Sequence, residues 1–360
     1  MPIDATSRVR SKSEAITPER LARRALLLGA PALSLMMRFG SAKAEEDTHY
    51  FRIGTAAATG TYFQIGGVLA NLISKPPGTN ECERGGSCGV EGLVAVAEAT
   101  QGSLENVAAV DAARLESALA QADIAYWAAT GTGLFKGKPP LDKLRAIASL
   151  FPECAHVVVS ADSAIHAVRD LKGKRVGLGE RESGTIVDAR LILDAAGITE
   201  RDLKPDYRAL SLAAQALQSG ELDAFFLFGG YPVPAIAQLA AGTPIRLLPV
   251  DGDSADRLLA KNAFFTRATI PANVYHGIDT ETQTISSDAL WIVNADVPDE
   301  LVYAITAALW RDANRRLLDQ GHPMGERIRL ANAMDGLAVR LHPGALRYYQ
   351  EIGLKNIPNQ

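Results

Sequence analysis

Residues 51–74, FRIGTAAATGTYFQIGGVLANLIS, place a short β-run, a loop rich in Gly, Ala and Thr, and a helix in direct succession. The apolar residues of the helical part recur every three or four positions and so share one helix face: Ile65, Val68, Leu69, Leu72 and Ile73. A strand, a loop and a helix in this order present free backbone N–H groups and the positive end of the helix dipole to an anion. The stretch therefore predicts an α/β unit with an anion-binding loop at residues 54–60.

The middle of the chain repeats this alternation of β-prone and helical segments. Strands are expected at residues 175–178, 224–228 and 245–250, with helices of about 8 to 12 residues between and after them. Such alternation is typical of a parallel sheet that is covered by helices on both faces. Three further β-prone runs are residues 123–127, 144–150 and 157–160, the last two separated by a bend that contains a proline.

The first 44 residues resemble an export signal in their composition. Arg20, Arg23 and Arg24 form a basic region, residues 25–37 are apolar, and Ala42-Lys43-Ala44 is a cleavage site of the A-x-A type. The apolar run is shorter than the roughly 20 residues of a membrane-spanning helix; the alternative is a buried core helix. Both the Sec and the twin-arginine route fit the pattern. We expect export to the periplasm with cleavage near Ala44.

The charge balance of the remaining chain argues against polyanionic partners. The full chain has 37 Lys/Arg and 41 Asp/Glu, of which the first 44 residues hold 8 and 3, so that the net charge after cleavage is −9. A mildly acidic chain of this kind is not expected to bind nucleic acid or an anionic membrane surface. Its length suffices for two lobes with separate cores, and we expect a monomer.

The three cysteines divide into a close pair and a single residue. Cys82 and Cys88 lie in a polar loop and are expected to form a local disulfide in an exported protein, the alternative being a metal site for which no histidine is near. Cys154 lies in an apolar stretch and is expected to be a small buried residue.

Motifs of catalysis and cofactor binding are not matched. Gly177 and Gly179 begin a G-x-G, but the third glycine comes too late for a dinucleotide site, and no P-loop is present. Ser87 lies in a G-x-S-x-G pattern that follows a loop rather than a strand, so a nucleophile elbow is not expected. The histidines lack the spacing of metal ligands. We expect no catalytic residue, no cofactor and no metal.

A second strand, loop and helix is predicted around residues 176–185. Ser183 and Thr185 are suited to cap the helix, and with Gly184 they can also hold a carboxylate or phosphate. The alternative is ordinary helix capping without a ligand. Gly230 and Tyr231 follow another predicted strand, at the end where open α/β sheets bind ligands.

Taken together, these segments resemble a TAXI-type solute receptor of TRAP (tripartite ATP-independent periplasmic) transporters. The resemblance extends over nearly all of the chain after the signal and is carried by the segments IGTAAATGTYFQIGGVLA, CGVEGLVAVAEATQGSLENV, LESALAQADIAYWA, LRAIASLFPE, DLKGKRVGLGERESGT, DAFFLFGGYPVPAI, ATIPANVY and LHPGALRYYQEIGL. The chain departs from the usual pattern at Ala56, Ala57, Ala122 and Glu182, which leaves the ligand open.

The resemblance implies an α/β fold of the type II periplasmic-binding-protein class, with two lobes joined by hinge strands. Lobe 1 is expected at residues 47–156 plus 284–360 and lobe 2 at residues 157–283. The hinge strands are expected near residues 156–160 and 284–293. Closure of the two lobes on a ligand is the expected mechanism.

The expected ligand is a small carboxylate, a glutamate-like amino or keto acid, bound between the lobes. Asp123 is suited to an ammonium group or to orienting backbone N–H groups, and the tyrosines are equally compatible with core packing. The candidate ligand-binding residues are Thr55, Thr59, Gly60, Tyr62, Ser103, Asp123, Tyr126, Ser183, Gly184, Thr185, Gly230 and Tyr231.

The function implied by the resemblance is that of a non-enzymatic periplasmic receptor that delivers its ligand to the membrane permease subunits of a TRAP transporter. The fold does not determine the membrane partner, so a receptor for an ABC importer or for a sensor system is an alternative. An exported hydrolase that uses the cleft for catalysis is the alternative from another class.

Overall fold

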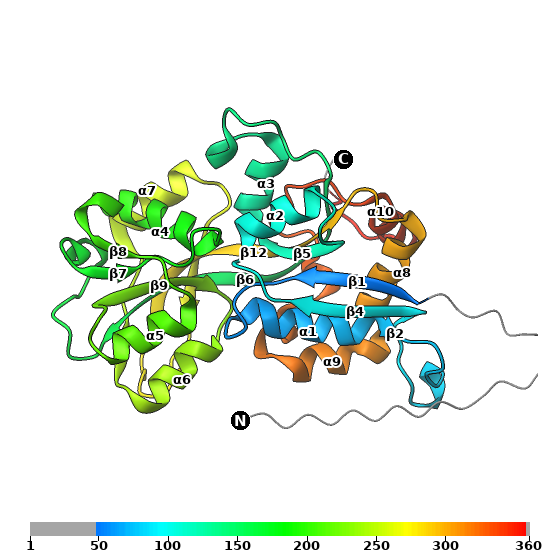
Figure 1. Ribbon diagram of the computed structural model, residues 1–360, viewed down its shortest axis with the longest axis horizontal. Helices are drawn as coiled ribbons and strands as arrows, with labels where there is room; N and C mark the ends of the chain where they lie inside the picture. Colours follow the sequence, from blue (N-terminus) through cyan, green and yellow to red (C-terminus); the bar gives the residue numbers. More distant parts are fainter. Residues whose placement is uncertain (1–47, 358–360) are drawn as a thin grey trace, which may run out of the picture. The chain divides into compact units, whose positions relative to one another are not determined.

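A curved, mixed sheet runs through residues 48–357, the part of the chain that the computed structural model describes (Figure 1). The predicted export signal at residues 1–44 lies outside this part. Two long strands, β6 (Leu144–Ser160) and β12 (Thr282–Asn294), lie antiparallel at the centre of the sheet. On one side of them lie elements from the two ends of the chain, here called the terminal half, and on the other side lie elements from between β6 and β12, the central half (Figure 1).

The terminal half has the strand order β4-β1-β5-β12-β6. Its strands β1 (His49–Gly54), β4 (Leu93–Glu98) and β5 (Ser117–Gln121) are parallel, and β12 joins β5 in antiparallel register. The helices of this half are α1 (Thr61–Ile73), α2 (Ser103–Asp111), α3 (Ala122–Thr130), α8 (Asp299–Trp310), α9 (Arg315–Gly321) and α10 (Pro343–Glu351). The short strands β2 (Ser74–Lys75) and β3 (Val90–Glu91) pair apart from the main sheet.

The central half has the corresponding order β8-β7-β9-β6-β10. Its strands are β7 (Arg175–Gly177), β8 (Lys204–Asp206), β9 (Ala224–Gly229) and β10 (Ile245–Leu247), and β11 (Thr266–Ile270) pairs with β12. Its helices are α4 (Gly184–Ala195), α5 (Leu210–Gln218), α6 (Pro234–Gly242) and α7 (Gly252–Lys261).

The two halves repeat one strand pattern. The order is β4-β1-β5-β12-β6 in the terminal half and β8-β7-β9-β6-β10 in the central half. In both, counted without the separate pair β2 and β3, the strand that comes second in the chain lies at the edge of the sheet, next to the first and then the third. An antiparallel crossing strand follows, which is β12 in the terminal half and β6 in the central half. The predicted α/β fold of the periplasmic-binding-protein class is therefore confirmed. Both predicted hinge segments lie within the crossing strands, and the lobe boundaries stay a prediction.

One continuous strand replaces the two β-runs and the bend expected around Pro152. Pro152 pairs with Asp288 of β12, next to a register shift at Ala289 and Leu290, and β9 begins to pair with β6 only at Cys154. Because proline lacks the N–H donor, it is tolerated in a strand where the ladder is interrupted in this way. The prediction of a bend was wrong, and the strand instead connects both halves.

Residues 123–127 form part of helix α3 rather than the predicted strand. Helix α3, ADIAYWAAT, contains four alanines, and alanine is the best helix former. The helix ends at Gly131, whose φ of 65° is the left-handed conformation of a helix C-terminus. Its apolar residues are buried on more than one face, so the three-to-four spacing that indicates a helix is not visible in the sequence.

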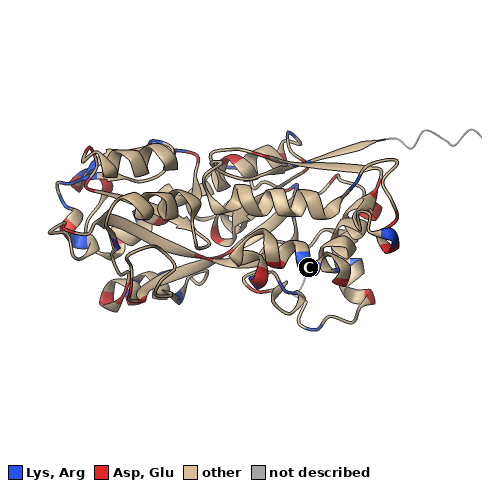
Figure 2. Ribbon diagram, turned by 90° about the horizontal axis from the view of Figure 1, so that it is seen from below, with Lys and Arg blue, Asp and Glu red and all other residues tan. Residues whose placement is uncertain are grey.

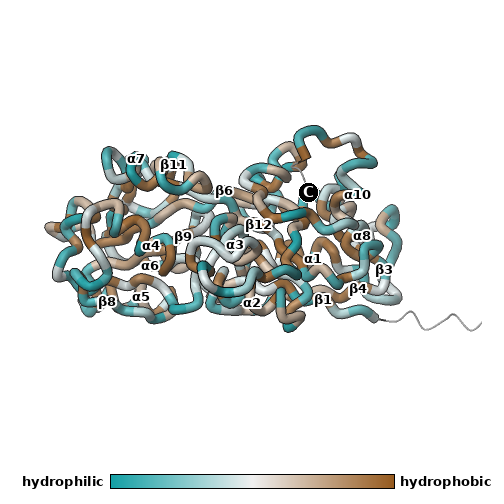
Figure 3. The backbone as a smooth tube through the Cα atoms, turned by 90° about the horizontal axis from the view of Figure 1, so that it is seen from above, coloured by the Kyte–Doolittle hydropathy of each residue, from teal (hydrophilic) through white to brown (hydrophobic). Residues whose placement is uncertain are grey.

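The core lies around the crossing strands. Trp291 of β12 is fully buried and donates a hydrogen bond from Nε1 to Oγ of Ser117 at 3.1 Å. Hydrophobic segments follow the inner helices and strands (Figure 3), and charged residues lie mainly on outer helices and loops (Figure 2). Between residues 48 and 357, no helix combines the length and the apolar character needed to cross a bilayer.

The cysteines are placed as the sequence predicts. Cys82 and Cys88 form a disulfide in the loop between β2 and β3, and Cys154 is a buried free thiol in β6. Burial raises the pKa of the Cys154 thiol to about 12, which keeps the thiol protonated and unreactive.

Candidate functional site

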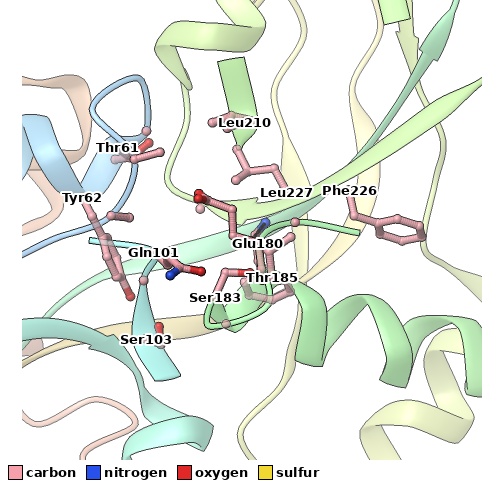
Figure 4. Close-up of a pocket in the computed structure, with 18 of the residues that line it drawn as sticks. Thr61, Tyr62, Gln101, Ser103, Glu180, Ser183, Thr185, Leu210, Phe226 and Leu227 are labelled. Atoms are coloured by element: carbon pink, nitrogen blue, oxygen red, sulfur yellow. Dashed lines mark hydrogen bonds between the residues drawn. The ribbon is translucent and has the colours of Figure 1, made fainter. Parts of the chain in front are cut away.

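A cavity lies between the terminal and the central half, beside the crossing strand β6. Its free volume of about 70 Å³ corresponds to roughly five water-sized positions. It is lined from the terminal half and β6 by Ala56, Ala57, Gly60, Thr61, Tyr62, Gln101, Gly102, Ser103, Gln121 and Glu153, and from the central half by Gly179, Glu180, Ser183, Gly184, Thr185, Arg208, Leu210, Ala213, Phe226, Leu227, Phe228 and Gly229. Figure 4 shows Thr61 and Tyr62 facing Glu180 and Leu227 across this space.

Several helices begin at the wall of the cavity. Gly60, Gly102, Gln121 and Ser183 are the residues that precede α1, α2, α3 and α4, and each of them lines the cavity. The first backbone N–H groups of a helix have no partner within the helix and lie at the positive end of its dipole. Convergence of these helix ends makes one part of the cavity a favourable place for an anionic group.

Two of these helix ends approach each other closely across the cavity. A side chain on Gly102 would place its Cβ 3.4 Å from Cα of Ser183, and the φ of 121° at Gly102 is a conformation that favours glycine. Behind this contact, the N–H of Glu105 donates to the carbonyl of Glu182 at 3.1 Å. Glycine at position 102 therefore lets the terminal half meet the start of α4.

Further hydrogen bonds join the two halves around the cavity. The Thr61 hydroxyl donates to the carbonyl of Gly230, and the N–H of Ala235 donates to the carbonyl of Thr59 at 3.2 Å. Gln121 donates from its Nε2 to Oδ2 of Asp188 in α4. The structure thus shows the two halves in contact, with the cavity enclosed between them.

Three carboxyl groups are buried next to the cavity. Asp123 and Asp188 are 0% exposed and Glu153 is 2% exposed. The Tyr62 hydroxyl donates to Oε2 of Glu153 at 2.6 Å, whereas both oxygens of Asp123 and Oδ1 of Asp188 have no hydrogen-bond partner in the described structure. Burial of an unpaired carboxylate costs free energy. These three groups are therefore stabilised by a proton, a hydrogen-bond donor or a cation.

Burial is the main cause of the altered acidity of this cluster. It raises the pKa of Asp123 to about 6, and it raises the pKa values of Glu153 and Asp188 well above their usual range. The negative charge of Asp123 adds to the effect at both of the other groups. Burial and the nearby charge of Glu153 also raise the pKa of the Tyr62 hydroxyl, which therefore remains a donor.

A further acid and a base reach the cavity from the central half. The carboxylate of Glu180 extends toward Thr61 and Tyr62 (Figure 4), and partial burial together with the charge of Glu105 raises its pKa. Arg208 is the basic residue among those that line the cavity in the described structure. Its guanidinium donates to Asp206 at 2.7 and 2.8 Å and to Glu221 at 3.1 Å, so its charge is already balanced.

Six of the predicted ligand-binding residues line the cavity: Gly60, Tyr62, Ser103, Ser183, Gly184 and Thr185. The structure brings the two predicted loops together, since the first three come from the terminal half and the others from the central half. Ser183 also accepts a hydrogen bond from the N–H of Ile186, so it caps α4 while facing the cavity.

The other predicted residues lie behind or beside the wall. Thr55 is buried and donates to the carbonyl of Glu98 at 2.7 Å, and Tyr126 packs its ring against Phe264. Asp123 lies behind the wall in the first turn of α3. Thr59, Gly230 and Tyr231 are beside the cavity and are not among the residues that line it.

The sequence did not reveal the most distinctive side chains of the site. Glu153 lies in the strand β6 and Asp188 in a predicted helix, where an acid usually faces solvent. Glu180 lies in a charged loop. Gln121 was noted only as part of a sequence pattern. The one sequence signal that points to Glu153 is an acid inside the mainly apolar run LRAIASLFPECAHVVVS of β6.

No group of three His, Cys, Asp or Glu side chains within residues 48–357 could hold a metal ion. The Ser87 hydroxyl donates to the carbonyl of Ser74 and accepts from the N–H of Gly89 at 3.2 Å, so it is used within its own loop.

Solved structures with a related arrangement include several binding proteins. The alkanesulfonate-binding protein SsuA from Xanthomonas axonopodis pv. citri, bound to MOPS, is 15% identical over 84% of each chain, with a TM-score of 0.46. PhnD1 from Prochlorococcus marinus (MIT 9301), in complex with methylphosphonate, is 10% identical over 84% of this chain and 98% of its own, with a TM-score of 0.48. The substrate-binding protein of an amino acid ABC transporter is 14% identical over 76% of this chain and 100% of its own, with a TM-score of 0.41.

The family is identified by a match along most of the chain. A model of the NMT1-like family matches residues 53–353, a range that begins in β1 and ends just after α10. Both halves and both crossing strands fall within the match. The chain therefore belongs to the NMT1-like family.

Proposed function

We propose that this protein is a periplasmic solute receptor that encloses a small organic solute with an acidic group between its two halves. The observation that carries the proposal is the convergence of the N-termini of α1, α2 and α4 on one enclosed cavity, from both halves of the molecule. Backbone N–H groups and helix dipoles at such ends stabilise an anionic group. The predicted carboxylate ligand, an amino or keto acid, is compatible with this wall.

Binding would be coupled to closure of the two halves. Gly60 and Ser103 contribute to the cavity from the terminal half, and Ser183 and Gly184 contribute from the central half. A solute that contacts both sets gains interactions only when the halves meet, and this difference shifts the population toward the closed state. The bonds from Thr61 to Gly230 and from Gln121 to Asp188 would stabilise that state.

The membrane partner belongs to the proposal as well. One of the structures reported above is named as the substrate-binding protein of an amino acid ABC transporter, which supports delivery to an importer of the ABC type. Delivery to TRAP-type permease subunits, expected from the resemblance to TAXI receptors, has no such support. We therefore place the ABC importer first and the TRAP permease second.

A thermal-shift screen of the chain that begins at Glu45 tests the proposal. A ligand that binds the folded state raises the melting temperature with its concentration. We expect shifts with small carboxylic, sulfonic or phosphonic acids and none with neutral sugars of similar size. Shifts with neutral sugars alone would contradict the proposal. A substitution of Gly184 by Ala, whose Cβ would meet Gln121 and Ser103, should reduce the shifts at each ligand concentration.

A further inference from the structure

Carboxylates face the cavity from both sides. Glu153 comes from the crossing strand β6, and Glu180 comes from the loop between β7 and α4 of the central half. Figure 4 shows Glu180 reaching toward Thr61 and Tyr62, and Tyr62 is the residue that hydrogen-bonds Glu153. Both acids therefore line the same cavity, Glu153 from β6 and Glu180 from the central half.

The inner oxygen of Glu153 is available to a ligand. Oε2 accepts from Tyr62, while in the described structure Oε1 has no hydrogen-bond partner. A Cβ placed on Gly229 would lie 3.9 Å from both Oε1 of Glu153 and Oγ1 of Thr61, so both oxygens border the space at Gly229. The Glu153 side chain is 2% exposed, so water from outside hardly reaches it.

Among residues 48–357, no Lys, Arg or His side chain forms an ion pair with Glu153 or Glu180. The groups around Glu153 are the Tyr62 hydroxyl and the carboxyl groups of Asp123 and Asp288, and the charged group next to Glu180 is Glu105. Arg208, the basic residue of the lining, is engaged by two acids. Because like charges in a buried site repel each other, closure without a cation or protons is disfavoured there.

We propose that Glu153 and Glu180 form a subsite for a positively charged nitrogen of the ligand, opposite the helix N-termini that hold its acidic group. This inference rests on the proposed receptor function and narrows the ligand class to zwitterions. Amino acids, aminosulfonates and aminophosphonates fit this chemistry, whereas the corresponding oxo and hydroxy acids do not. A charged nitrogen between two carboxylates from opposite sides also holds the closed state together.

Pairs of ligands that differ mainly in the nitrogen group measure its contribution to binding. Alanine and lactate, aspartate and malate, and taurine and isethionate differ mainly in an ammonium group against a hydroxyl group. Isothermal titration of the chain beginning at Glu45 is expected to show at least tenfold tighter binding of the amine in those pairs that bind. The variants Glu153→Gln and Glu180→Gln should each reduce this ratio at least fivefold. Glu182→Gln, an exposed acid of the same loop, should leave the ratio unchanged.

Proton exchange on binding provides a second readout. Burial raises the pKa of Glu153, so the empty closed cavity favours its protonated form, and an incoming ammonium group should displace that proton. Titrations of wild type in two buffers of different ionisation enthalpy should show proton release with an amine and not with its hydroxy analogue. Glu153→Gln should lose the release, provided that its circular dichroism spectrum and melting curve match those of wild type.

The outcomes distinguish this inference from the function on which it rests. Binding of hydroxy acids as tight as that of their amines would overturn the ammonium subsite and leave the receptor in place. Ratios unchanged in both glutamine variants would also overturn it, as would stabilisation by Ca²⁺ without any response to amines. Failure of every acid in all pairs to bind would contradict the proposed function and the subsite together.

Discussion

Gln121 and Asp188 are joined by a hydrogen bond from Nε2 of the amide to Oδ2 of the carboxyl group. Gln121 precedes α3 in the terminal half, Asp188 lies in α4 of the central half, and both side chains are buried. The bond is therefore a direct link between the halves beside the cavity. It also provides Asp188 with its hydrogen-bond donor, because Oδ1 has no partner in the described structure.

Substitution of Gln121 by Ala should weaken the contact between the halves. Removal of the donor leaves the buried Asp188 without a hydrogen bond, which costs about 1 to 3 kcal/mol. We expect a decrease of this size in the free energy of unfolding in urea, and an increase in the radius of gyration in X-ray solution scattering. Gln215→Ala, an exposed residue of α5, is the matched control. Equal behaviour of the two variants would show that the link is not important.

A methyl group at position 184 should obstruct closure. The Cβ of Gly184→Ala would lie 1.3 Å from Oε1 of Gln121 and 3.0 Å from Oγ of Ser103, both on the opposite side of the interface. We expect at least tenfold weaker binding of any ligand that stabilises wild type, measured by titration calorimetry. Gly67→Ala in α1 has no atom within 4 Å of the new Cβ, and should be stabilising by up to about 1 kcal/mol. Unchanged affinity in Gly184→Ala would contradict the closed structure as the binding form.

The buried acids predict an unusual dependence of stability on pH. The pKa of Asp123 is raised from 3.8 to about 6, so the folded state binds a proton more tightly than the unfolded state. The contribution of this group is therefore fully present below about pH 4 and is lost as the pH rises to about 6. Its size is about 3 kcal/mol.

Asp123→Asn should remove this dependence. The neutral amide keeps the shape of the side chain and can donate to Asp188, so the variant should be more stable than wild type at pH 7, by up to about 3 kcal/mol, and nearly equal to it at pH 4. Urea denaturation at several pH values measures the difference. Asp279→Asn, an exposed acid, should show no such trend. A stability of wild type that rises between pH 4 and pH 6 relative to Asp123→Asn would contradict the assignment.

The disulfide between Cys82 and Cys88 should affect stability without affecting binding. It closes a short loop, and the loop-entropy model gives about 2 kcal/mol for a loop of this size. We expect the double variant Cys82→Ala, Cys88→Ala to lose about this free energy of unfolding and to keep its ligand affinity, because neither cysteine lines the cavity. Dithiothreitol should destabilise wild type to the same degree and leave the double variant unchanged. A weaker ligand affinity of the double variant would link this loop to the site.

The sequence was sufficient for the parts of the fold that depend on local patterns. The opening strand, loop and helix were correctly predicted, because the spacing of Ile65, Leu69 and Leu72 shows directly which helix face is buried. The hinge strand that the resemblance implies near residues 284–293 lies within β12 (Thr282–Asn294). The continuous strand β6 was missed, because the effect of Pro152 depends on where its neighbours β9 and β12 pair, which is not a local property.

In the site, too, residues with a local sequence signature were predicted, and residues that depend on long-range contacts were not. The glycines and hydroxyl groups at the starts of α1 and α4 were found because capping residues have a local signature. The acids Glu153 and Asp188 were not found, since an acidic residue within a strand or helix usually faces solvent. Glu153 contacts Tyr62, which is 91 residues away in the chain, and Asp188 contacts Gln121, which is 67 residues away. A single sequence does not contain contacts over such distances.

The crossing strands also determine how the chain is partitioned along its length. β6 leads into the central half and β12 leads out of it, and the pairing of Cys154 with Ser286 brings the entry and the exit side by side. The central half is thus an insertion whose two ends are neighbours. Such a segment can be exchanged as a cassette between related proteins with only two junctions, so that one wall of the cavity is replaced while the other wall is kept.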